Sequence, residues 1–285
     1  MKLRLYQIDA FASRVFSGNP AAVVPLDRWL PDATMQAIAA ENNLSETAFF
    51  VGEKGYFQIR WMTPTDEVDL CGHATLASAW VVFNEIENGR TEVHFRSQSG
   101  PLRVTAEGDL LALDFPSRPP EPADGSLDAL ARALGARPRE ALASRDYLAV
   151  FESEEEVRAL TPDVARVAAL DRMAVIATAP GSGSDFVSRF VVPSLGIPED
   201  PVTGSAHCTL VPYWSQRLGK TSLFARQVSA RGGELWCENR GERAVVIALR
   251  NDERLADATA ALDLPKGWER PAALARLRDA ALAGD

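Results

Sequence analysis

The amino-acid sequence predicts an α+β fold made of two similar halves, and three observations support this prediction. Short β-like runs alternate with turn residues along the chain, without the steady βαβ rhythm of a doubly wound parallel sheet. A unit of strand, acidic loop and Gly-x-Ala turn occurs twice in the same order. Between the two copies, residues 116–122 contain four prolines, which disfavour helix and sheet interior and favour an extended linker.

The first half, 1–115, is predicted to be rich in strands. Its β-like runs are Leu3–Phe11, Ala21–Pro25, Thr47–Val51, Tyr56–Met62 and Glu92–Arg96, followed by a hairpin that joins Leu102–Ala106 to Leu110–Phe115. Two helical segments interrupt these strands. They are Asp32–Glu41, with Asp32 as the expected N-cap, and Ala74–Glu85, whose apolar residues recur at helical spacing.

The second half, 123–249, shows the same mixture. The predicted helices are Ser126–Leu134 and Ser153–Leu160, and the predicted strands are Tyr147–Phe151, Met173–Ala179, Phe186–Val192, Leu223–Ser229, Glu234–Glu238 and Ala244–Leu249. Ser153 and Glu156 fit a capping box at the start of the second helix. Residues 250–285 are predicted to form an atypical, charged helical tail.

The internal repeat is the most informative feature of the sequence. Residues 57–65 align with 186–194 at an offset of 129, and residues 67–74 align with 199–206 at an offset of 132. The change in offset corresponds to a three-residue insertion. Two copies of one unit predict two halves related by a pseudo-twofold axis, so their helix starts are expected to face each other.

The composition excludes several functional classes. The 285 residues are 46% hydrophobic and 24% charged, which is typical of a globular protein. A net charge of −9 without a basic run argues against nucleic acid and anionic membranes as partners. The three cysteines cannot form a disulfide framework, and no apolar run approaches the roughly 20 residues of a membrane span. The N-terminus does not resemble a signal peptide, so we expect a cytoplasmic protein.

The two Gly-x-Ala turns are candidate anion sites, because a helix start presents unpaired N–H groups and a partial positive charge. His73 occupies the tip of the first turn and Ser205 that of the second, and Asp200 lies five residues before Ser205. These groups could move or orient protons. Each also has a structural interpretation: a buried imidazole, a helix cap and a turn former. For His94 and His207 a structural role is expected.

Metal ions and organic cofactors are not predicted. The three histidines are scattered, no His/Cys/Asp set has ligand spacing, and neither a phosphate loop nor a dinucleotide fingerprint occurs. A Ser-His-Asp hydrolase is not expected either, because no G-x-S-x-G elbow frames Ser205.

Four stretches resemble the PhzF-like family of phenazine-biosynthesis isomerases. They are residues 9–11 with 18–23, 43–50, 67–75 and 196–207, in family order, and the resemblance runs from residue 3 to about 249. It implies the diaminopimelate epimerase-like fold. In that fold each of two pseudo-twofold-related halves is a mostly antiparallel sheet wrapped around a central helix, with the active site between the halves.

The resemblance also implies a cofactor-independent isomerase in which Glu46 is the general acid/base, supported by His73, Asp200 and Ser205. Read without the family, Glu46 is an ordinary acidic residue before a strand. One carboxyl group in a largely dry cleft could take a proton from one carbon and return it to another on the same face, moving a double bond. The positions expected to bind substrate are Asn19, Cys71, Gly72, Thr203 and Gly204.

The related diaminopimelate epimerases use two cysteines on opposite faces of the substrate carbon. The matching positions here are Cys71 and Thr203. A neutral threonine hydroxyl is a poor base, so a one-base isomerisation is expected instead. Cys71 has two open interpretations: a buried structural thiol, or an acid whose pKa is lowered by His73 and a helix start.

We therefore expect an isomerase that acts on a small carboxylate bound between the halves. One alternative is an epimerase or racemase of a small amino or hydroxy acid, using Glu46 with Cys71 or Asp200 on opposite faces. Another is a non-catalytic protein that binds a metabolite or a protein partner. A homodimer is expected from the resemblance and from the frequency of twofold dimers.

Overall fold

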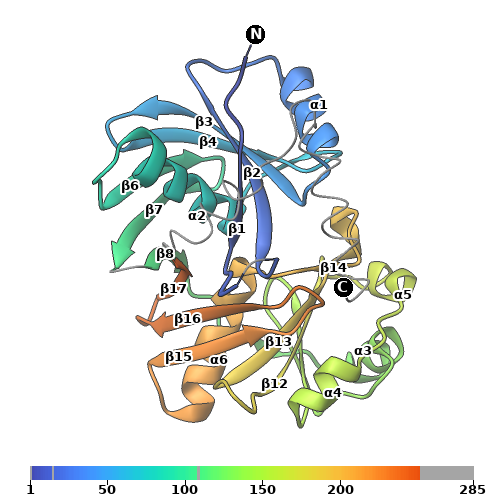
Figure 1. The fold of residues 1–285 in the computed structure, drawn as a ribbon. Coiled ribbons are helices and arrows are strands. Elements are labelled where there is room, and N and C mark those ends of the chain that lie inside the picture. Colours follow the sequence, from blue (N-terminus) through green and yellow to red (C-terminus); the bar gives the residue numbers. More distant parts are fainter. Residues whose placement is uncertain (1, 15, 108–109, 251–285) are drawn as a thin grey trace, which may run out of the picture. The chain divides into compact units, whose positions relative to one another are not determined.

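The computed structural model describes residues 2–14, 16–107 and 110–250, which belong to one compact unit, Met1–Asn251. The strands of this unit hydrogen-bond into one network that wraps around two central helices, α2 (Gly72–Val81) and α6 (His207–Leu218) (Figure 1). The α+β class is confirmed, with two halves of the diaminopimelate epimerase-like kind.

The N-terminal half contains every element predicted for it and adds the short strand β5. Its remaining elements are β1 (Tyr6–Ala10), β2 (Asn19–Leu26), α1 (Asp32–Asn42), β3 (Glu46–Glu53), β4 (Tyr56–Met62), β5 (Glu67–Val68), the π-helical turn η1 (Val82–Ile86), β6 (Glu92–Ser97), β7 (Gly100–Glu107) and β8 (Leu110–Pro116). Its strand pairs are antiparallel except β2–β3 and β4–β6, which are parallel.

The C-terminal half has the same plan. Its strands are β9 (Glu121–Pro122), β10 (Glu140–Ala143), β11 (Tyr147–Val150), β12 (Val175–Pro180), β13 (Phe186–Val191), β14 (Glu199–Asp200), β15 (Ser222–Gln227), β16 (Gly233–Asn239) and β17 (Arg243–Arg250). Its other helices are α3 (Leu127–Leu134), α4 (Glu154–Ala159), α5 (Val164–Ala168) and the 3₁₀ turns η2 (Pro193–Leu195) and η3 (Gly204–Ala206). No range was predicted for β9, β10, β14 and α5, which are too short for periodicity to identify, and α6 was indicated only by the Gly-x-Ala turn that precedes it.

The two halves repeat one register. Trp61 pairs with Val68 across β4 and β5, and Phe190 pairs with Asp200 across β13 and β14. The corresponding strands in the two halves differ by the same offsets, 129 and 132, that the sequence repeat shows. The parallel pair β4–β6 likewise has its counterpart in β13–β15. The repeated unit is therefore a structural unit.

Matching ion pairs brace the two copies. Arg60 donates from Nε and Nη2 to the two oxygens of Glu67 at 2.8 and 2.6 Å. Arg189 donates from the same two atoms to Glu199 at 2.8 and 2.7 Å. A bidentate arginine–carboxylate pair fixes direction as well as distance, so each pair holds its acidic loop against the preceding strand.

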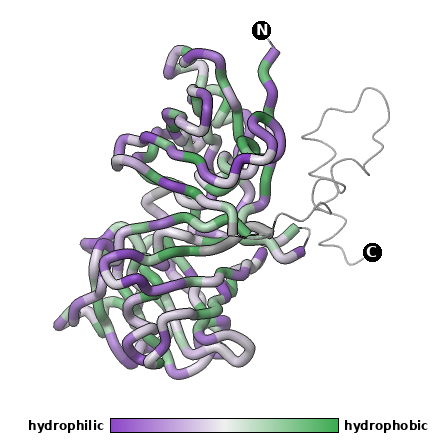
Figure 2. Tube along the Cα trace, turned by 90° about the vertical axis from the view of Figure 1, so that its left-hand side faces the viewer, coloured by the Kyte–Doolittle hydropathy of each residue, from purple (hydrophilic) through white to green (hydrophobic). Residues whose placement is uncertain are grey.

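The hydrophobic core surrounds the two central helices. Every residue of α2 except Trp80 is buried, as expected for an apolar helix enclosed on all sides. In α6, Trp214 is 1% exposed and stacks on Phe186 with 5.6 Å between ring centroids. One apolar cluster includes residues of both helices, so the halves share a core. Figure 2 shows hydrophobic and hydrophilic residues alternating along the chain.

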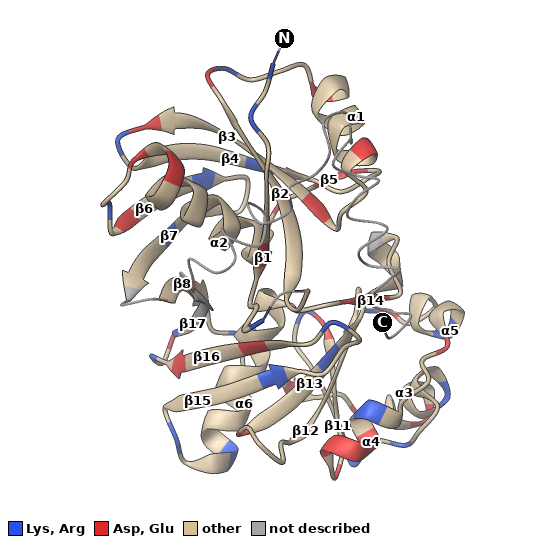
Figure 3. Ribbon diagram, viewed as in Figure 1, with Lys and Arg blue, Asp and Glu red and all other residues tan. Residues whose placement is uncertain are grey.

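The halves are also joined by main-chain hydrogen bonds. Strand β8 pairs antiparallel with β17, with Phe115 opposite Ala244. The ion pair between Arg243 and Asp114, 2.9 Å, supports the same junction. Charged residues of both signs are interspersed over the two halves (Figure 3).

Two local expectations needed correction. Asp32 is not the N-cap of α1, because Pro31 holds that position. Asp32 is instead the first helical residue and accepts a hydrogen bond from Arg60 Nη1 at 2.8 Å. At α4, Ser153 caps the helix as predicted, accepting from Glu156 N–H at 3.3 Å. The Glu156 carboxylate, however, accepts from the N–H of Glu152 at 3.1 Å, one residue before the cap.

The predicted helical tail, 250–285, lies outside the described residues beyond Arg250. Within the described ranges, no helix has the length and apolar character needed to cross a membrane.

Candidate active site

The starts of α2 and η3 contact each other, as the repeat predicted. Gly72 opens α2 and Gly204 opens η3, and both face the ring of Phe115. A Cβ atom on Gly72 would lie 2.7 Å from Phe115 Cζ, and one on Gly204 would lie 3.2 Å from Phe11 Cζ and 3.6 Å from Phe115 Cζ. Glycine at position 72 is therefore required by the close approach of an aromatic ring.

Glu46 lies beside the first helix start. It is the first residue of β3 and pairs with Ala21 of the parallel strand β2. The residue is 9% exposed, and its Oε2 atom lies 3.1 Å from His73 Nε2. The alignment of these two atoms is poor for a hydrogen bond, and neither has another partner among the described residues. The carboxylate and the imidazole thus lie next to each other, and Glu46 Oε2 and His73 Nε2 can each still form a hydrogen bond with a bound molecule.

The other nitrogen of His73 faces two polar atoms. His73 Nδ1 lies 3.5 Å from Cys71 Sγ and 3.3 Å from Asn19 Nδ2. Burial opposes a charge on His73, but its interactions with Cys71 and with the Glu46 carboxylate outweigh burial and hold the pKa of His73 well above the usual value. Burial, reinforced by the charge of Glu46, raises the pKa of Cys71 to about 11. The thiol is therefore neutral at physiological pH, which contradicts the interpretation of Cys71 as an acid of lowered pKa.

Asn19 connects the two halves at the site. Its side chain is fully buried, and its Nδ2 donates to Asp200 Oδ1 at 2.8 Å and to the carbonyl of Val202 at 2.9 Å. Its Oδ1 atom has no partner within the described structure. Asn19 therefore positions groups from both halves while its own carbonyl stays available as an acceptor.

Asp200 is held from three sides. Besides the bond from Asn19, the Thr203 hydroxyl donates to Asp200 Oδ2 at 2.5 Å. Gln227 donates to the Asp200 carbonyl at 2.8 Å and accepts from the Thr203 N–H at 2.8 Å. Burial is the largest influence on this carboxyl and raises its pKa to about 6. The loop before η3 is thus fixed by the two buried amide side chains of Asn19 and Gln227.

Ser205 joins the site through a different neighbour. It is half-buried at the tip of the second turn, where Arg145 Nη2 donates to Ser205 Oγ at 3.4 Å. Arg145 is paired with the buried carboxylate of Asp146 at 2.8 Å.

Glu46, Cys71 and His73 are also possible metal ligands. One ligand atom from each lies within 4.8 Å of the others, and carboxylate, thiolate and imidazole are the ligand types that zinc accepts. Sequence spacing could not reveal this set, because Glu46 comes from a strand 25 residues before Cys71.

His207 and His94 occupy structural positions. His207 is fully buried, and its Nδ1 donates to the carbonyl of Thr203 at 2.9 Å. His94 stacks on the exposed ring of Tyr56 with 5.0 Å between ring centroids.

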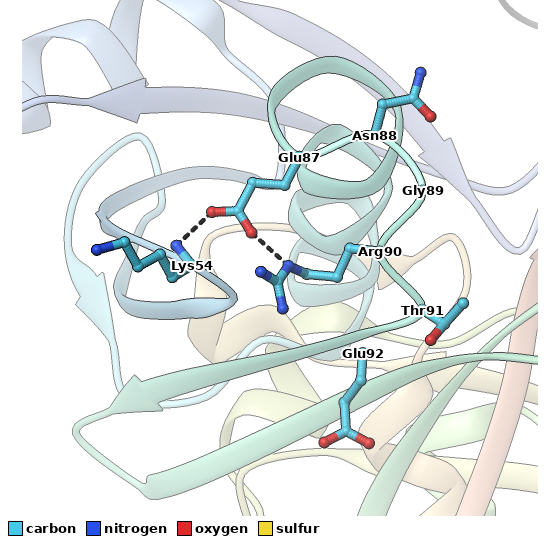
Figure 4. Close-up of a pocket in the computed structure, with 7 residues that line it drawn as sticks. All are labelled: Lys54, Glu87, Asn88, Gly89, Arg90, Thr91 and Glu92. Carbon is cyan, nitrogen blue, oxygen red and sulfur yellow. Dashed lines mark hydrogen bonds and ion pairs between the residues drawn. The ribbon is translucent and has the colours of Figure 1, made fainter.

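An open pocket of about 490 Å³ lies elsewhere, lined by Lys54 and residues 87–92 (Figure 4). Glu87 contacts both the Lys54 N–H and Arg90 there. Lys54 follows the end of β3 opposite to Glu46, roughly 25 Å along the strand. This pocket is therefore separate from the candidate active site.

Sequence reasoning missed two residues of the site. Gln227 lies in a strand pattern, where a polar residue gives no functional signal. Arg145 lies in a turn with other charged residues, and only its position in the fold brings it to Ser205.

Comparisons with known proteins agree with this architecture. The family model for phenazine biosynthesis-like proteins matches residues 8–248. An uncharacterized isomerase of Pseudomonas aeruginosa is 56% identical over 247 residues, covering 86% of this chain and 94% of its own. A second uncharacterized isomerase of that organism is 53% identical over 246 residues, covering 86% and 95%. A crystal structure of a PhzF-family phenazine biosynthesis protein from Enterococcus faecalis is similar with a TM-score of 0.84, 50% identity and coverage of 87% and 96%.

Proposed function

Because this chain belongs to the phenazine biosynthesis-like (PhzF) family, we propose that it is an isomerase that moves a proton within a small carboxylate metabolite. Glu46 is the general acid and base of this reaction. The general class is supported by relatives named as isomerases. The observation that carries the mechanism is the buried pair of Glu46 Oε2 and His73 Nε2, 3.1 Å apart, neither of which has a hydrogen-bond partner among the described residues.

The reaction needs one proton carrier. Glu46 removes a proton from one carbon of the substrate, the electron pair of the broken C–H bond shifts the double bond, and the carboxyl group returns the proton to another carbon on the same face. His73 provides a positive partner for the carboxylate during this cycle. The fixed Asp200 and the N–H groups at the two helix starts orient the substrate.

A pair of bases at Glu46 and Cys71 fits the geometry poorly. Two bases on opposite faces of one carbon must each reach it at about 3 Å, so their reactive atoms would stand about 6 Å apart. Glu46, Cys71 and His73 instead have ligand atoms within 4.8 Å of one another. A thiol with a pKa of about 11 is also a poor source of a base at neutral pH.

An epimerase that uses Glu46 and Asp200 is the second candidate. Glu46 lies at Nε2 of His73, whereas Asp200 accepts a hydrogen bond from Asn19, whose Nδ2 lies 3.3 Å from the opposite nitrogen of that ring. The two carboxyl groups thus flank His73 from different sides. The configuration of the product distinguishes this reaction from a double-bond shift.

Proton NMR in D₂O provides the test, with dihydro-hydroxyanthranilate and a panel of small amino and hydroxy acids as substrates. Glu46→Gln keeps the side-chain volume and removes the proton carrier, so deuterium uptake should fall by about 100-fold or more. The matched control is Glu53→Gln, at the exposed far end of the same strand. It should retain full activity.

Near-normal exchange by Glu46→Gln would refute the assignment of the acid/base. Binding of a panel compound without exchange by the wild type would instead indicate the non-catalytic alternative.

A further inference from the structure

We propose that Arg145 binds the carboxylate of the substrate in the C-terminal half, so that the reacting carbon faces Glu46 in the N-terminal half. The orientation of the substrate rests on the proposed function above. The carboxylate site itself can be tested without turnover.

The guanidinium of Arg145 has one occupied edge and one open edge. Nε and Nη2 both donate to Asp146 Oδ2, at 3.0 and 2.8 Å. Nη2 also lies 3.4 Å from Ser205 Oγ, and Nη1 has no hydrogen-bond partner in the part of the chain that the structure describes. Nη1 can therefore donate to a carboxylate, and Nη2 can donate a parallel bond to the same group in place of its long 3.4 Å bond to Ser205 Oγ.

The surroundings fix this edge before a ligand arrives. The Arg145 side chain is 33% exposed, whereas that of Asp146 is only 4% exposed. The same turn is attached to α6, since the hydroxyl groups of Ser144 and Thr209 lie 2.8 Å apart. A guanidinium anchored by a buried carboxylate loses little freedom on binding, which favours affinity.

The charges of the site favour a positively charged residue as the partner of the substrate carboxylate. Glu46 and Asp200 each carry a carboxyl group, and His73 is the positive partner that contacts Glu46. A bound carboxylate adds a further negative charge to a poorly solvated region, where it needs a positive hydrogen-bonding partner. Arg145 offers this charge at the tip of the second helix start.

The internal repeat gives an independent reason to look at this position. By the strand register, Ala174 stands where the N-terminal half has Glu46, and Arg145 stands where it has Pro20, next to Asn19. The C-terminal half therefore lacks the acid/base at the equivalent position and presents a cation beside it. Each half contributes a different function to one substrate.

Isothermal titration with benzoate and its uncharged analogue benzamide tests the site. The wild type should bind benzoate more tightly than benzamide. Arg145→Gln should weaken benzoate binding by about 10- to 100-fold and leave benzamide binding unchanged, because it removes a charge-assisted double hydrogen bond. The matched control is Arg172→Gln, an exposed arginine that donates to the Ser144 carbonyl of the same turn. It should bind both compounds like the wild type.

Arg145→Gln leaves the buried carboxylate of Asp146 without its positive partner, and this variant could fail to fold. Arg145→Lys is therefore a second variant for the same test. Lysine keeps the positive charge but not the planar fork, so benzoate affinity should fall by about tenfold. The proposal would be overturned if a folded Arg145 variant bound benzoate as tightly as the wild type does. It would also be overturned if the wild type bound benzoate no more tightly than benzamide. Glu46→Gln should keep the benzoate preference, so failure of the carboxylate site and failure of the proposed acid/base are separate results.

Discussion

Replacing His207 is expected to remove part of the acid sensitivity of folding. This histidine is fully buried at the start of α6, where Nδ1 donates to the Thr203 carbonyl at 2.9 Å. Its Nε2 atom has no partner among the described residues. Burial is the main cause that lowers the pKa of His207 from 6.5 to about 4. Protonation of this imidazole therefore destabilises the folded state relative to the unfolded state.

The sign and size of the effect follow from this pKa difference. The unfolded chain binds a proton at His207 near pH 6.5, whereas the folded chain does so only near pH 4. As the pH falls through this window, the unfolded state holds more protons and the free energy of unfolding decreases. The full difference corresponds to about 3 kcal/mol, of which about 2 kcal/mol is lost by pH 5.

Urea unfolding at a series of pH values from 7.5 to 5, followed by circular dichroism, measures this loss. His207→Gln keeps a donor for the Thr203 carbonyl and cannot be protonated. It should be less stable than the wild type at pH 7.5, and this gap should narrow by about 2 kcal/mol at pH 5. His73 and Asp200 titrate in both proteins and therefore largely cancel in the comparison. Unfolding free energies of the two proteins that stay parallel over this range would refute the reasoning.

Two further predictions concern packing and metal chemistry. Gly72→Ala should lower the free energy of unfolding by about 1–3 kcal/mol in urea titrations, because its Cβ would lie 2.7 Å from Phe115 Cζ. Gly204→Ala is the matched control with closest contact at 3.2 Å and should cost less, so equal losses would contradict the packing argument. EDTA should leave deuterium exchange unchanged, since the proposed reaction uses only protein side chains. Loss of activity that zinc restores would show instead that Glu46, Cys71 and His73 hold a metal needed for the reaction.

The fold could be predicted from the sequence because its signals are local or repeated. Polar and apolar residues alternate along Tyr56–Met62, which is typical of a strand, and β4 has the same bounds in the structure. The offsets of 129 and 132 appear again as strand registers. Strand β10 escaped prediction because its four residues are all half-buried and it is stabilised by pairing with β9 and β11. That information is in the tertiary structure and not in the segment itself.

The candidate site was predictable only in part. The Gly-x-Ala turns indicate where two helices start, so His73 and Ser205 became candidates because they occupy the middle position of these turns. Glu46 gives no such signal, because an acidic residue before a strand is common. It became a candidate through the family resemblance. Its approach to His73 depends on the parallel pairing of β2 with β3, which no local pattern encodes.

The two copies of the repeated unit share the residues that stabilise it but differ in the polar residues at their helix starts. The residues that brace the acidic loops, Arg60 with Glu67 and Arg189 with Glu199, are the same in both copies and make matching bonds. These pairs have a structural task that each half needs. The residues at the helix starts differ, with His73 in one copy and Ser205 in the other. A symmetric pair of acid/base groups suits inversion at one carbon, where a proton leaves one face and arrives at the other. An asymmetric pair suits a substrate held at one end and deprotonated at the other, and the difference between the copies therefore supports one-sided proton transfer.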